Sequence, residues 1–478
     1  MKKPATCAGC PLETRGEGFS EPSGPADALI CFVGEALGAE EVGPGRPFVG
    51  AAGRKLDASI LRLGMDRSQV RVGNVISCRP PGNHLSGAGY EHSAIQHCRP
   101  NREKLSGHKV YVPLGVIATR TLLSELGGDT YGGKLENWRG YVIPARLNGL
   151  AWTEAPTTYI VPTYHPSHLI QGQQRLTGVF LHDIKRAMEV ASFGYAHDEV
   201  SLVGDPDPDW FAEWAGQLSP DCWLACDIET SMKIGLQEDD LDVPVGEITR
   251  INFSFHPDQG ITVPWDGRYL PTITSLLTSP GIKVFWNEAY DVPILRERAG
   301  IPVAGPIYDG MWAWHLLQSN LPKGLGFVSP FYSRLPPWKH LSDSATTYYA
   351  AMDAVQTLRC MFGIARDLQR SNQWDTFLRY VVQFDAQVLH PMERAGLLID
   401  SAALLSFQSR LKQEEARIYD VIQQLVPEAA LPLLPRDGWK RIPKGYPPEA
   451  IITLDRNREI LVCSTCGTSD VPPTHLCP

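Results

Sequence analysis

The stretch WLACDIET, residues 223–230, predicts a buried β-strand with two acidic side chains. Asp227 and Glu229 lie two positions apart, and side chains two apart on a strand project from the same face. Two carboxylates side by side repel each other unless a cation lies between them. The stretch therefore predicts an α/β core in which this strand contributes to a metal site.

Further acids follow in order along the chain. Residues 286–291, WNEAYD, place Asn287 and Asp291 at a strand-to-helix junction, and residues 349–353, YAAMD, place Tyr349 and Asp353 on one face of a helix. An Asp-x-Glu pair alone has a plain interpretation as a solvated pair near a turn. Four acids with a positioned tyrosine, however, are the groups that two-metal phosphodiester hydrolysis requires.

This ordered set resembles the DEDD exonucleases of the tyrosine subtype, the 3′→5′ proofreading domains of family A DNA polymerases, over residues 220–370. The resemblance implies a ribonuclease-H-like α/β fold with two Mg²⁺ or Mn²⁺ ions. It implies that Tyr349 orients the attacking water, that Asn287 supports the substrate strand and that Asp309 is a structural acid. By the same resemblance the metal ligands are Asp227, Glu229, Asp291 and Asp353.

A second group of motifs lies nearer the N-terminus. Apolar runs at 28–34, 71–77, 109–115 and 158–163 alternate with helical stretches, which predicts an α/β fold with a mostly parallel sheet. A glycine loop after one such strand could be only a tight turn. Several polar loops at strand ends instead favour the ligand crevice of an open α/β sheet. These loops are ICFVGEALG at 30–38, GRPFVG at 45–50, NVISCRPPG at 74–82 and YHPS at 164–167.

These motifs resemble family-4 uracil-DNA glycosylases over residues 1–195. The resemblance implies that Phe48 stacks on a flipped base, that Asn74 reads its edge and that His165 faces a uracil carbonyl. A carboxamide can accept from uracil N3–H while donating to O4, a pairing that cytosine does not offer. An imidazole donor would stabilise the charge that grows on the departing base. The side chains implied on the water and sugar side are Glu35, Ala36 and Glu41.

Three positions depart from the glycosylase pattern. Leu37 replaces a usual proline, Val42 stands where an acid is common, and His84 replaces a frequent arginine. Three alternatives therefore stay open for this part of the chain: uracil excision, a changed base preference, and a DNA-binding relic without catalytic activity.

Four of the eleven cysteines are predicted to bind metal. Four thiolates bind either zinc or a [4Fe–4S] cluster, and their spacing does not choose between them. The resemblance implies the iron–sulfur cluster at Cys7, Cys10, Cys78 and Cys98. The cysteines in apolar runs are predicted to be small buried side chains: Cys31, Cys222, Cys226 and Cys360. A second set is predicted either to bind Zn²⁺ or to form an incomplete ribbon: Cys463, Cys466, His475 and Cys477.

The net charge of −9 is unevenly distributed. Residues 1–195 hold 21 Lys and Arg against 17 Asp and Glu, whereas residues 196–370 hold 12 against 23. A mildly basic segment suits contact with DNA phosphates, and an acidic one is compatible with DNA where cations screen its carboxylates. The expected partners are DNA single strands, DNA 3′ ends and uracil-containing single or double strands.

The pattern of breaks predicts five segments. A glycosylase-like domain at 1–195 is followed by a linker at 196–219, an exonuclease domain at 220–370, a helical segment resembling a polymerase thumb at 371–430, and a loop-rich tail at 431–478. Residues 387–400, QVLHPMERAGLLID, resemble the opening of a family A polymerase region, but the polymerase acids do not follow. A separate DNA polymerase chain is therefore an expected partner, and a truncated reading frame is the alternative.

Taken together, the motifs predict an enzyme with two activities, uracil excision from DNA and 3′→5′ trimming of DNA ends. The alternative is an accessory DNA-binding subunit of a split family A polymerase, in which the glycosylase fold is silent and only the exonuclease acts. No window approaches the ~18 apolar residues of a membrane span, so the expected location is the cytoplasm of a bacterial or phage-infected cell.

Overall fold

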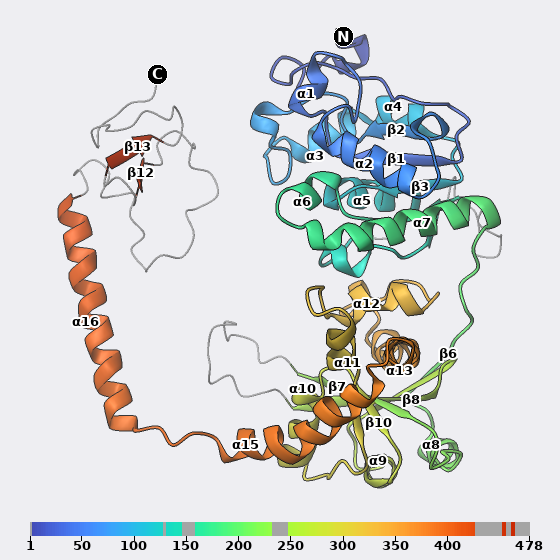
Figure 1. Cartoon of the computed structure of the whole chain (residues 1–478), viewed down its shortest axis with the longest axis vertical. Helices are drawn as coiled ribbons and strands as arrows, with labels where there is room; N and C mark the ends of the chain where they lie inside the picture. Colours follow the sequence, from blue (N-terminus) through green and yellow to red (C-terminus); the bar gives the residue numbers. More distant parts are fainter. Residues whose placement is uncertain are drawn as a thin grey trace. The chain divides into compact units, whose positions relative to one another are not determined.

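The computed structural model describes residues 2–127, 131–145, 158–231, 247–425, 452–455 and 460–463 (Figure 1). The chain divides into two compact units, residues 1–390 and 391–478. The first unit contains two β-sheets, and we call the parts built on them the first module (residues 2–195) and the second module (residues 196–390).

The first module is built on a five-stranded sheet with the order β2-β1-β3-β5-β4. All neighbouring strands are parallel except β4 and β5. Every residue of the inner strands β1 and β3 is buried, as expected of a parallel sheet covered on both faces. The mostly parallel sheet predicted from the sequence is confirmed. The strands are β1 (Ile30–Gly34), β2 (Arg71–Asn74), β3 (Val110–Pro113), β4 (Ile143–Pro144) and β5 (Tyr159–Ile160).

Helices cover this sheet, and α5 and α7 both contact β1 and β3 (Figure 1). Helix α7 buries a stripe with helical spacing that includes Phe180, Ile184 and Ala187, so its apolar face explains its position against the sheet. The helices of the module are α1 (Ala39–Val42), α2 (Ala51–Arg62), α3 (Glu91–His97), α4 (Arg99–Arg102), α5 (Val116–Leu122), α6 (Pro166–Ile170) and α7 (Thr177–Phe193).

The second module is built on a six-stranded sheet with the order β11-β10-β7-β8-β9-β6. Strands β7, β8 and β9 form an antiparallel meander, and β10 and β11 extend it in parallel. This is the ribonuclease-H-like arrangement that the sequence predicts. The strands are β6 (Ser201–Gly204), β7 (Leu224–Thr230), β8 (Ile248–His256), β9 (Gln259–Pro264), β10 (Lys283–Phe285) and β11 (Ile307–Asp309).

The segment predicted as a linker, residues 196–219, carries regular structure. Strand β6 pairs in parallel with β9 at the edge of the second sheet, and helix α8 (Pro208–Ala215) follows it. Asp207 caps this helix by accepting from two backbone N–H groups, and Pro208 occupies its first turn, where a missing N–H costs nothing. Pro208 thus marks the start of a helix within the segment predicted as a linker.

The long helix α13 (Thr346–Arg370) packs across β7, β8 and β9. It buries fifteen residues, among them Asp353. The other helices of the module are α9 (Leu270–Thr278), α10 (Glu288–Pro293), α11 (Gly310–Leu317), α12 (Leu325–Tyr332) and α14 (Trp374–Thr376), followed by the helical turns η11 (Phe377–Gln383) and η12 (Asp385–Leu389). Cys31, Cys226 and Cys360 are buried as predicted, whereas Cys222 is only half-buried.

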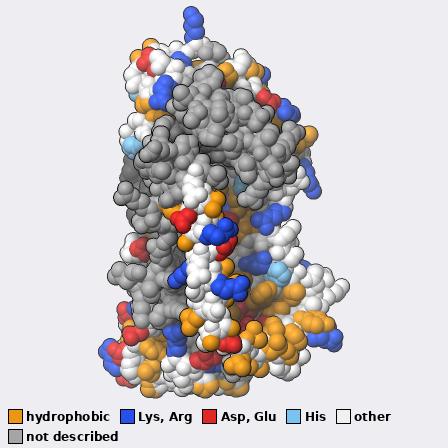
Figure 2. Space-filling view, turned by 90° about the vertical axis from the view of Figure 1, so that its left-hand side faces the viewer, with side chains coloured by type: hydrophobic (Ala, Val, Ile, Leu, Met, Phe, Trp, Pro, Cys, Tyr) orange, Lys and Arg blue, Asp and Glu red, His pale blue; other side chains and the backbone are white. Residues whose placement is uncertain are grey.

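The second unit has little buried surface in its described part. After α15 (His390–Ala395), helix α16 (Ser401–Leu425) exposes apolar side chains such as Leu405 and Phe407. Figure 2 shows exposed apolar side chains, drawn in orange, on the face that it presents. Strands β12 (Ile452–Asp455) and β13 (Ile460–Cys463) form an antiparallel pair. Within the described residues, no helix combines the length and apolarity needed to span a bilayer.

The two modules share one hydrophobic core, which includes Trp138 of the first and Phe327 of the second. Arg139 lies at this junction with no exposed surface, and donates to Asp183 Oδ1 at 2.9 Å and to the carbonyl of Phe327 at 3.0 Å. Its guanidinium also lies over the rings of Phe327 and Phe331, 4.7 and 4.6 Å from their centroids. The modules are therefore joined by buried contacts across a shared core.

We expect Arg139→Met to destabilise the first unit by about 3 kcal/mol, because removing one partner of a buried ion pair leaves Asp183 uncompensated. Urea unfolding followed by tryptophan fluorescence measures this loss, since Trp138 lies beside the junction. Arg54→Met is the matched control. Arg54 pairs with Glu40 at the surface, where both side chains are more than half exposed, so its loss should leave the unfolding midpoint unchanged. Equal midpoints for the two variants would contradict the role of Arg139.

Candidate active sites

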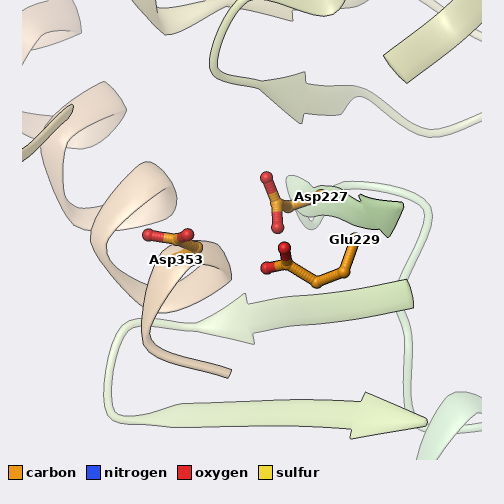
Figure 3. Close-up of side chains that lie close together, drawn as sticks. All are labelled: Asp227, Glu229 and Asp353. Atoms are coloured by element: carbon orange, nitrogen blue, oxygen red, sulfur yellow. The ribbon is translucent and has the colours of Figure 1, made fainter. Parts of the chain in front are cut away.

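Three carboxylates converge in the second module. Asp227 and Glu229 project from β7 and Asp353 from α13, and Figure 3 shows the three side chains pointing toward one another. One ligand atom from each lies within 4.8 Å of the others. Period-two spacing on the strand and the crossing of α13 over β7 produce this group. Hard oxygen ligands at this separation are compatible with divalent cations such as Mg²⁺ or Mn²⁺.

Asp291 lies on α10 next to this group, but its carboxylate is not within the same 4.8 Å set. Its Oδ1 accepts a hydrogen bond from the backbone N–H of Ile228, the residue between Asp227 and Glu229. The fourth acid thus contacts the same strand. From this position Asp291 can approach a cation that Asp227 also binds. The charge of Asp291 also raises the pKa of Asp227.

Burial and mutual repulsion shift these carboxyls strongly. Burial raises the pKa of Asp227 well above its ordinary value, and the charges of Asp353, Asp291 and Glu229 add to the effect. The pKa of Glu229 is raised to about 7 by burial and then by Asp353, and that of Asp291 to about 8, mainly by burial. Glu229 Oε1 is buried and has no hydrogen-bond partner in the described ranges of the chain. Such a set is stable in its charged form only beside a cation.

Three residues that the sequence did not single out contact the carboxylates. Asn252 Nδ2 donates to Asp227 Oδ2 at 2.7 Å, and Trp338 Nε1 donates to Asp353 Oδ1 at 2.7 Å. Lys339 Nζ lies 2.7 and 2.9 Å from the two oxygens of Asp353. Burial opposes the charge of Lys339, but Asp353 and Tyr349 hold its pKa above the ordinary value. No periodic pattern marks these positions, because they reach the site only through the tertiary fold.

Tyr349 and Asn287 also lie at this end of the module. The hydroxyl oxygen of Tyr349 accepts from Lys339 Nζ at 3.1 Å. Asn287 has a left-handed backbone (φ 74°) at the turn that leads into α10. Asp309 holds this turn, since its carboxylate accepts from the backbone N–H groups of Asn287 and Glu288 and caps α11. All of these partners are backbone N–H groups at the ends of helices, so the contacts of Asp309 are structural.

A cleft of about 610 Å³ lies in the first module among the loops that leave its strands. Five of the six residues assigned to base and sugar contact line it, together with Tyr164 and Ser167. These five are Glu35, Ala36, Glu41, Phe48 and His165, whereas the sixth, Asn74, is not among the lining residues. The departures Leu37, Val42 and His84 are not among its lining residues.

Phe48 and Asn74 are forced together above Gly34. A Cβ at Gly34 would lie 2.4 Å from Asn74 Oδ1 and 2.5 Å from Phe48 Cζ, so only glycine fits below them. Phe48 itself has a left-handed backbone (φ 56°), and Gly53 lets the Phe48 carbonyl approach closely. Both amide atoms of Asn74 are buried without hydrogen-bond partners. An unsatisfied buried amide beside an aromatic ring is the arrangement expected for a ligand with donor and acceptor groups.

His165 is held as a neutral donor. Its Nδ1 accepts from the backbone N–H of Ser167 at 3.2 Å and lies 2.6 Å from the Ser167 hydroxyl, so the neutral ring carries its proton on Nε2. Burial, and then the nearby His168, lowers the pKa of His165 to about 4. Its ring centroid lies 5.9 Å from that of Phe48. The cleft therefore combines an aromatic face with an uncharged N–H donor, and the buried Asn74 amide lies beside the aromatic ring.

The two acids of the cleft differ in their surroundings. Glu41 Oε2 accepts from the backbone N–H of Gly38 at 3.0 Å, and burial is the main cause of its raised pKa. The backbone of residues 48–50 also faces this carboxylate and partly offsets that effect, so Glu41 supports the loop that carries Phe48. The pKa of Glu35 is raised by burial and then by Glu91. Glu35 lines the cleft, and its side chain has no hydrogen-bond partner in the part of the chain that the structure describes.

The four predicted N-terminal cysteines line one enclosed cavity with Lys3 and Asn101. Donors surround the sulfurs: backbone N–H groups of Leu12 and Ser77 donate to Cys10 and Cys98, and Asn101 Nδ2 also donates to Cys98. Burial, followed by the neighbouring charges, raises the pKa of Cys7, and burial raises that of Cys78 to about 12. The proposed tail ligands Cys466, His475 and Cys477 lie outside the described residues, as does the side chain of Cys463.

The model of the Uracil DNA glycosylase superfamily matches residues 21–188. Among similar proteins, the type-4 uracil-DNA glycosylase of Thermotoga maritima is 29% identical over 182 residues, covering 38% of this chain and 87% of that protein. The enzyme of Sulfurisphaera tokodaii is 34% identical over 181 residues (37% and 73%), and that of Pyrobaculum aerophilum is 30% identical over 178 residues (37% and 86%).

Solved structures with some likeness include Escherichia coli RNase D, with 14% identity and a TM-score of 0.33 over 42% of this chain and 52% of that one. Another is RNase D of Trypanosoma brucei with RNA U12 (18% identity, TM-score 0.28, 34% and 61%). A third is the POL domain of Pol1 from M. smegmatis (15% identity, TM-score 0.35, 47% and 37%). The chain spans between 37% and 61% of these three structures.

The raised pKa values of the carboxylate group predict a pH-dependent stability. A carboxyl whose folded pKa exceeds its unfolded value stabilises the fold at low pH and loses that contribution as the pH rises through the folded value. We expect the melting temperature of the metal-free chain to fall as the pH rises from about 4 to about 8, the span set by Glu229 and Asp291. Mn²⁺ should raise it more at the upper end, because binding displaces protons.

The matched variant is Glu229→Gln, which removes one of these titrating groups. Its melting temperature should vary less steeply with pH than that of the wild type, and Mn²⁺ should stabilise it less. Identical pH profiles in calorimetry would contradict the assignment of the shift to this carboxyl.

Proposed function

The chain belongs to the uracil-DNA glycosylase superfamily, and on this premise we propose that its first module excises uracil from DNA while its second module trims DNA 3′ ends. The observation that carries the first activity is the unsatisfied amide of Asn74 beside Phe48 and the neutral His165. The observation that carries the second is the convergence of Asp227, Glu229 and Asp353.

Uracil has the pattern of polar atoms that the cleft leaves open. Asn74 Oδ1 would accept from N3–H and its Nδ2 would donate to O4, which satisfies two atoms that have no partner among the described residues. Cytosine presents an acceptor and a donor in the reverse order at these positions, so its binding would leave both groups of Asn74 unpaired. The ring of Phe48 supplies the stacking face that a base needs once it leaves the duplex.

His165 would act on the departing base. Breakage of the glycosidic bond leaves negative charge on uracil, and a donor that faces O2 stabilises that charge more than the neutral ground state. The Nε2 proton is available because Ser167 holds Nδ1 as an acceptor. The low pKa keeps the ring neutral, so it would stabilise the leaving anion by a hydrogen bond from Nε2 and not by transferring a proton to it. Glu35, in the same cleft, is placed to hold the water or the sugar.

In the second module the carboxylates of Asp227, Glu229, Asp353 and Asp291 would hold two divalent cations. When bound, the cations would activate a water molecule and neutralise charge on the scissile phosphate. Lys339 fixes the orientation of Asp353 and donates to Tyr349, whose hydroxyl proton then remains free to orient the nucleophile. Asn287 would contact the substrate strand from the turn before α10.

The four-cysteine cavity fits an iron–sulfur cluster better than one zinc ion. Zinc bonds of about 2.3 Å place tetrahedral sulfurs less than about 4 Å apart. Among the described residues, no three of these four sulfur atoms lie within 4.8 Å of one another, although all four cysteines line the cavity. The sulfurs are therefore too far apart for a single zinc ion. Cys7, Cys10, Cys78 and Cys98 would hold a [4Fe–4S] cluster, which ties the N-terminal arm to the loop after β2.

Two activities in one chain can be separated by chelation. Incubated in EDTA with a 5′-labelled uracil-containing oligonucleotide, the protein should form alkali-sensitive abasic sites without shortening the strand. His165→Gln should lower this excision by about two orders of magnitude, the usual cost of losing one charge-stabilising donor, and spare trimming in Mg²⁺. Asp227→Ala should do the reverse. Trimming without excision would favour the alternative, an accessory subunit of a polymerase chain whose glycosylase fold only binds DNA.

The cluster has a direct spectroscopic test. Protein purified without oxygen should be brown, with broad visible absorption that bleaches on reduction. This colour distinguishes the cluster from zinc, because zinc thiolates are colourless. Cys98→Ser should lose most of this absorption, whereas Cys360→Ser, which changes a buried cysteine of the second module, should keep it. A colourless wild type with one equivalent of zinc would refute the cluster.

A further inference from the structure

Residues 338–340, the sequence Trp-Lys-His, lie between the two modules and contact both. The Trp338 ring packs edge-on against Tyr141 of the first module, with centroids 6.4 Å apart, and the His340 ring packs on Trp138, with centroids 4.4 Å apart. Trp338 and Trp138 have no exposed surface. Lys339 lies between these two anchoring residues, so its backbone is held from the first module on both sides.

The same segment holds the carboxylate group of the second module. Both oxygens of Asp353 accept from it, one from Trp338 Nε1 and Lys339 Nζ and the other from Lys339 Nζ. Lys339 also donates to the Tyr349 hydroxyl. The orientation of a metal ligand and of the tyrosine beside it therefore depends on where this lysine is held.

The stem of Lys339 is confined as well as its ends. A Cβ at Gly326, on α12, would lie 2.7 Å from Asn137 Oδ1 of the first module and 3.1 Å from Lys339 Cγ. Gly326 thus lies between Asn137 and the aliphatic part of Lys339, and a larger side chain at this position would clash with both. Asn137 ends the short helix η6 (Leu135–Asn137), and Trp138, which follows it, is fixed by donating from Nε1 to the Gly132 carbonyl at 2.8 Å.

We propose that the first module is part of the exonuclease site: through Trp138, Tyr141 and Asn137 it holds the 338–340 segment, and Lys339 of that segment is a positioning residue for Asp353 and Tyr349. The inference rests on the proposed exonuclease. It explains why the modules share a core, because a flexible tether would leave Lys339 free to move away from Asp353.

A purely neutralising lysine and a positioning lysine differ in their effect on rate. An ammonium next to a metal ligand repels the cation, so removing it should tighten metal binding under either account. Loss of orientation should lower the rate at saturating metal only if Lys339 positions Asp353 and Tyr349. Under the proposal, removing the Lys339 ammonium therefore raises the affinity for metal and lowers the rate of 3′ trimming.

The test is a double-mutant cycle on the full chain with Lys339→Met, His340→Ala and both changes together. Mn²⁺ affinity is measured by titration calorimetry, with Asp227→Ala as the blank, and 3′ trimming is measured at saturating Mn²⁺. We expect Lys339→Met to bind Mn²⁺ at least threefold more tightly and to trim at least tenfold more slowly. His340→Ala alone should also raise Mn²⁺ affinity and lower the trimming rate. In the Lys339→Met background, it should change the affinity and the rate by less than twofold each.

Arg175→Ala is the matched control, because Arg175 donates to the Asn320 carbonyl at the same junction but not to the 338–340 segment. It should leave Mn²⁺ affinity and trimming unchanged. Gly326→Ala is the second variant should His340→Ala fold poorly, since its methyl group displaces the Lys339 stem. Additive effects of His340→Ala and Lys339→Met, or an unchanged rate in both His340→Ala and Gly326→Ala, would overturn the proposal.

The cycle also separates this inference from the exonuclease itself. If the wild type binds Mn²⁺ but trims no 3′ ends, the proposed nuclease activity fails, and the Mn²⁺ affinities still decide whether His340 acts through Lys339. If no Mn²⁺ binds at a site abolished by Asp227→Ala, both proposals fail together.

Discussion

The buried charge of Arg139 constrains how the first unit is assembled. A guanidinium with no exposed surface must have all of its charge compensated inside the protein, and its partners come from both modules: Asp183 from the first and the Phe327 carbonyl from the second. Neither module alone could bury it at an acceptable cost. The sheet of each module can therefore be described separately, and the second module has a hydrophobic cluster of its own, but the core at the junction belongs to both modules.

The sequence predicts best what depends on local periodicity. Asp227 and Glu229 follow from the period of a strand, Asp353 and Tyr349 from that of a helix, and the parallel sheet of the first module from its run of apolar strands. Lys339 was not predicted, because the two prolines and the tryptophan before it form no periodic pattern. Its role in the site depends on how closely its segment approaches α13, which the local sequence does not indicate. Strand β6 was missed for a related reason: four residues at a sheet edge gain their structure from β9.

Preorganisation in the first module is obtained at a local cost. Phe48 has a backbone conformation that a bulky residue rarely adopts, and Asn74 keeps two polar atoms buried without partners. Each is unfavourable in the free protein by an amount that a fitting ligand can recover. The glycines at 34 and 53 make this arrangement sterically accessible.

The carboxylate group of the second module has the opposite problem, since its cost is electrostatic rather than steric. Asp227, Glu229 and Asp291 all have raised pKa values because their charges are buried together. Lys339 pairs with Asp353, and its charge only partly offsets the raised pKa values of Asp227 and Glu229. One ammonium cannot balance four carboxylates, so the remaining charge favours multivalent cations. Yet an ammonium that neutralised the group completely would exclude those cations. A single lysine, held at one edge of the group by contacts from the other module, orients one ligand and leaves the rest of the site able to bind metal.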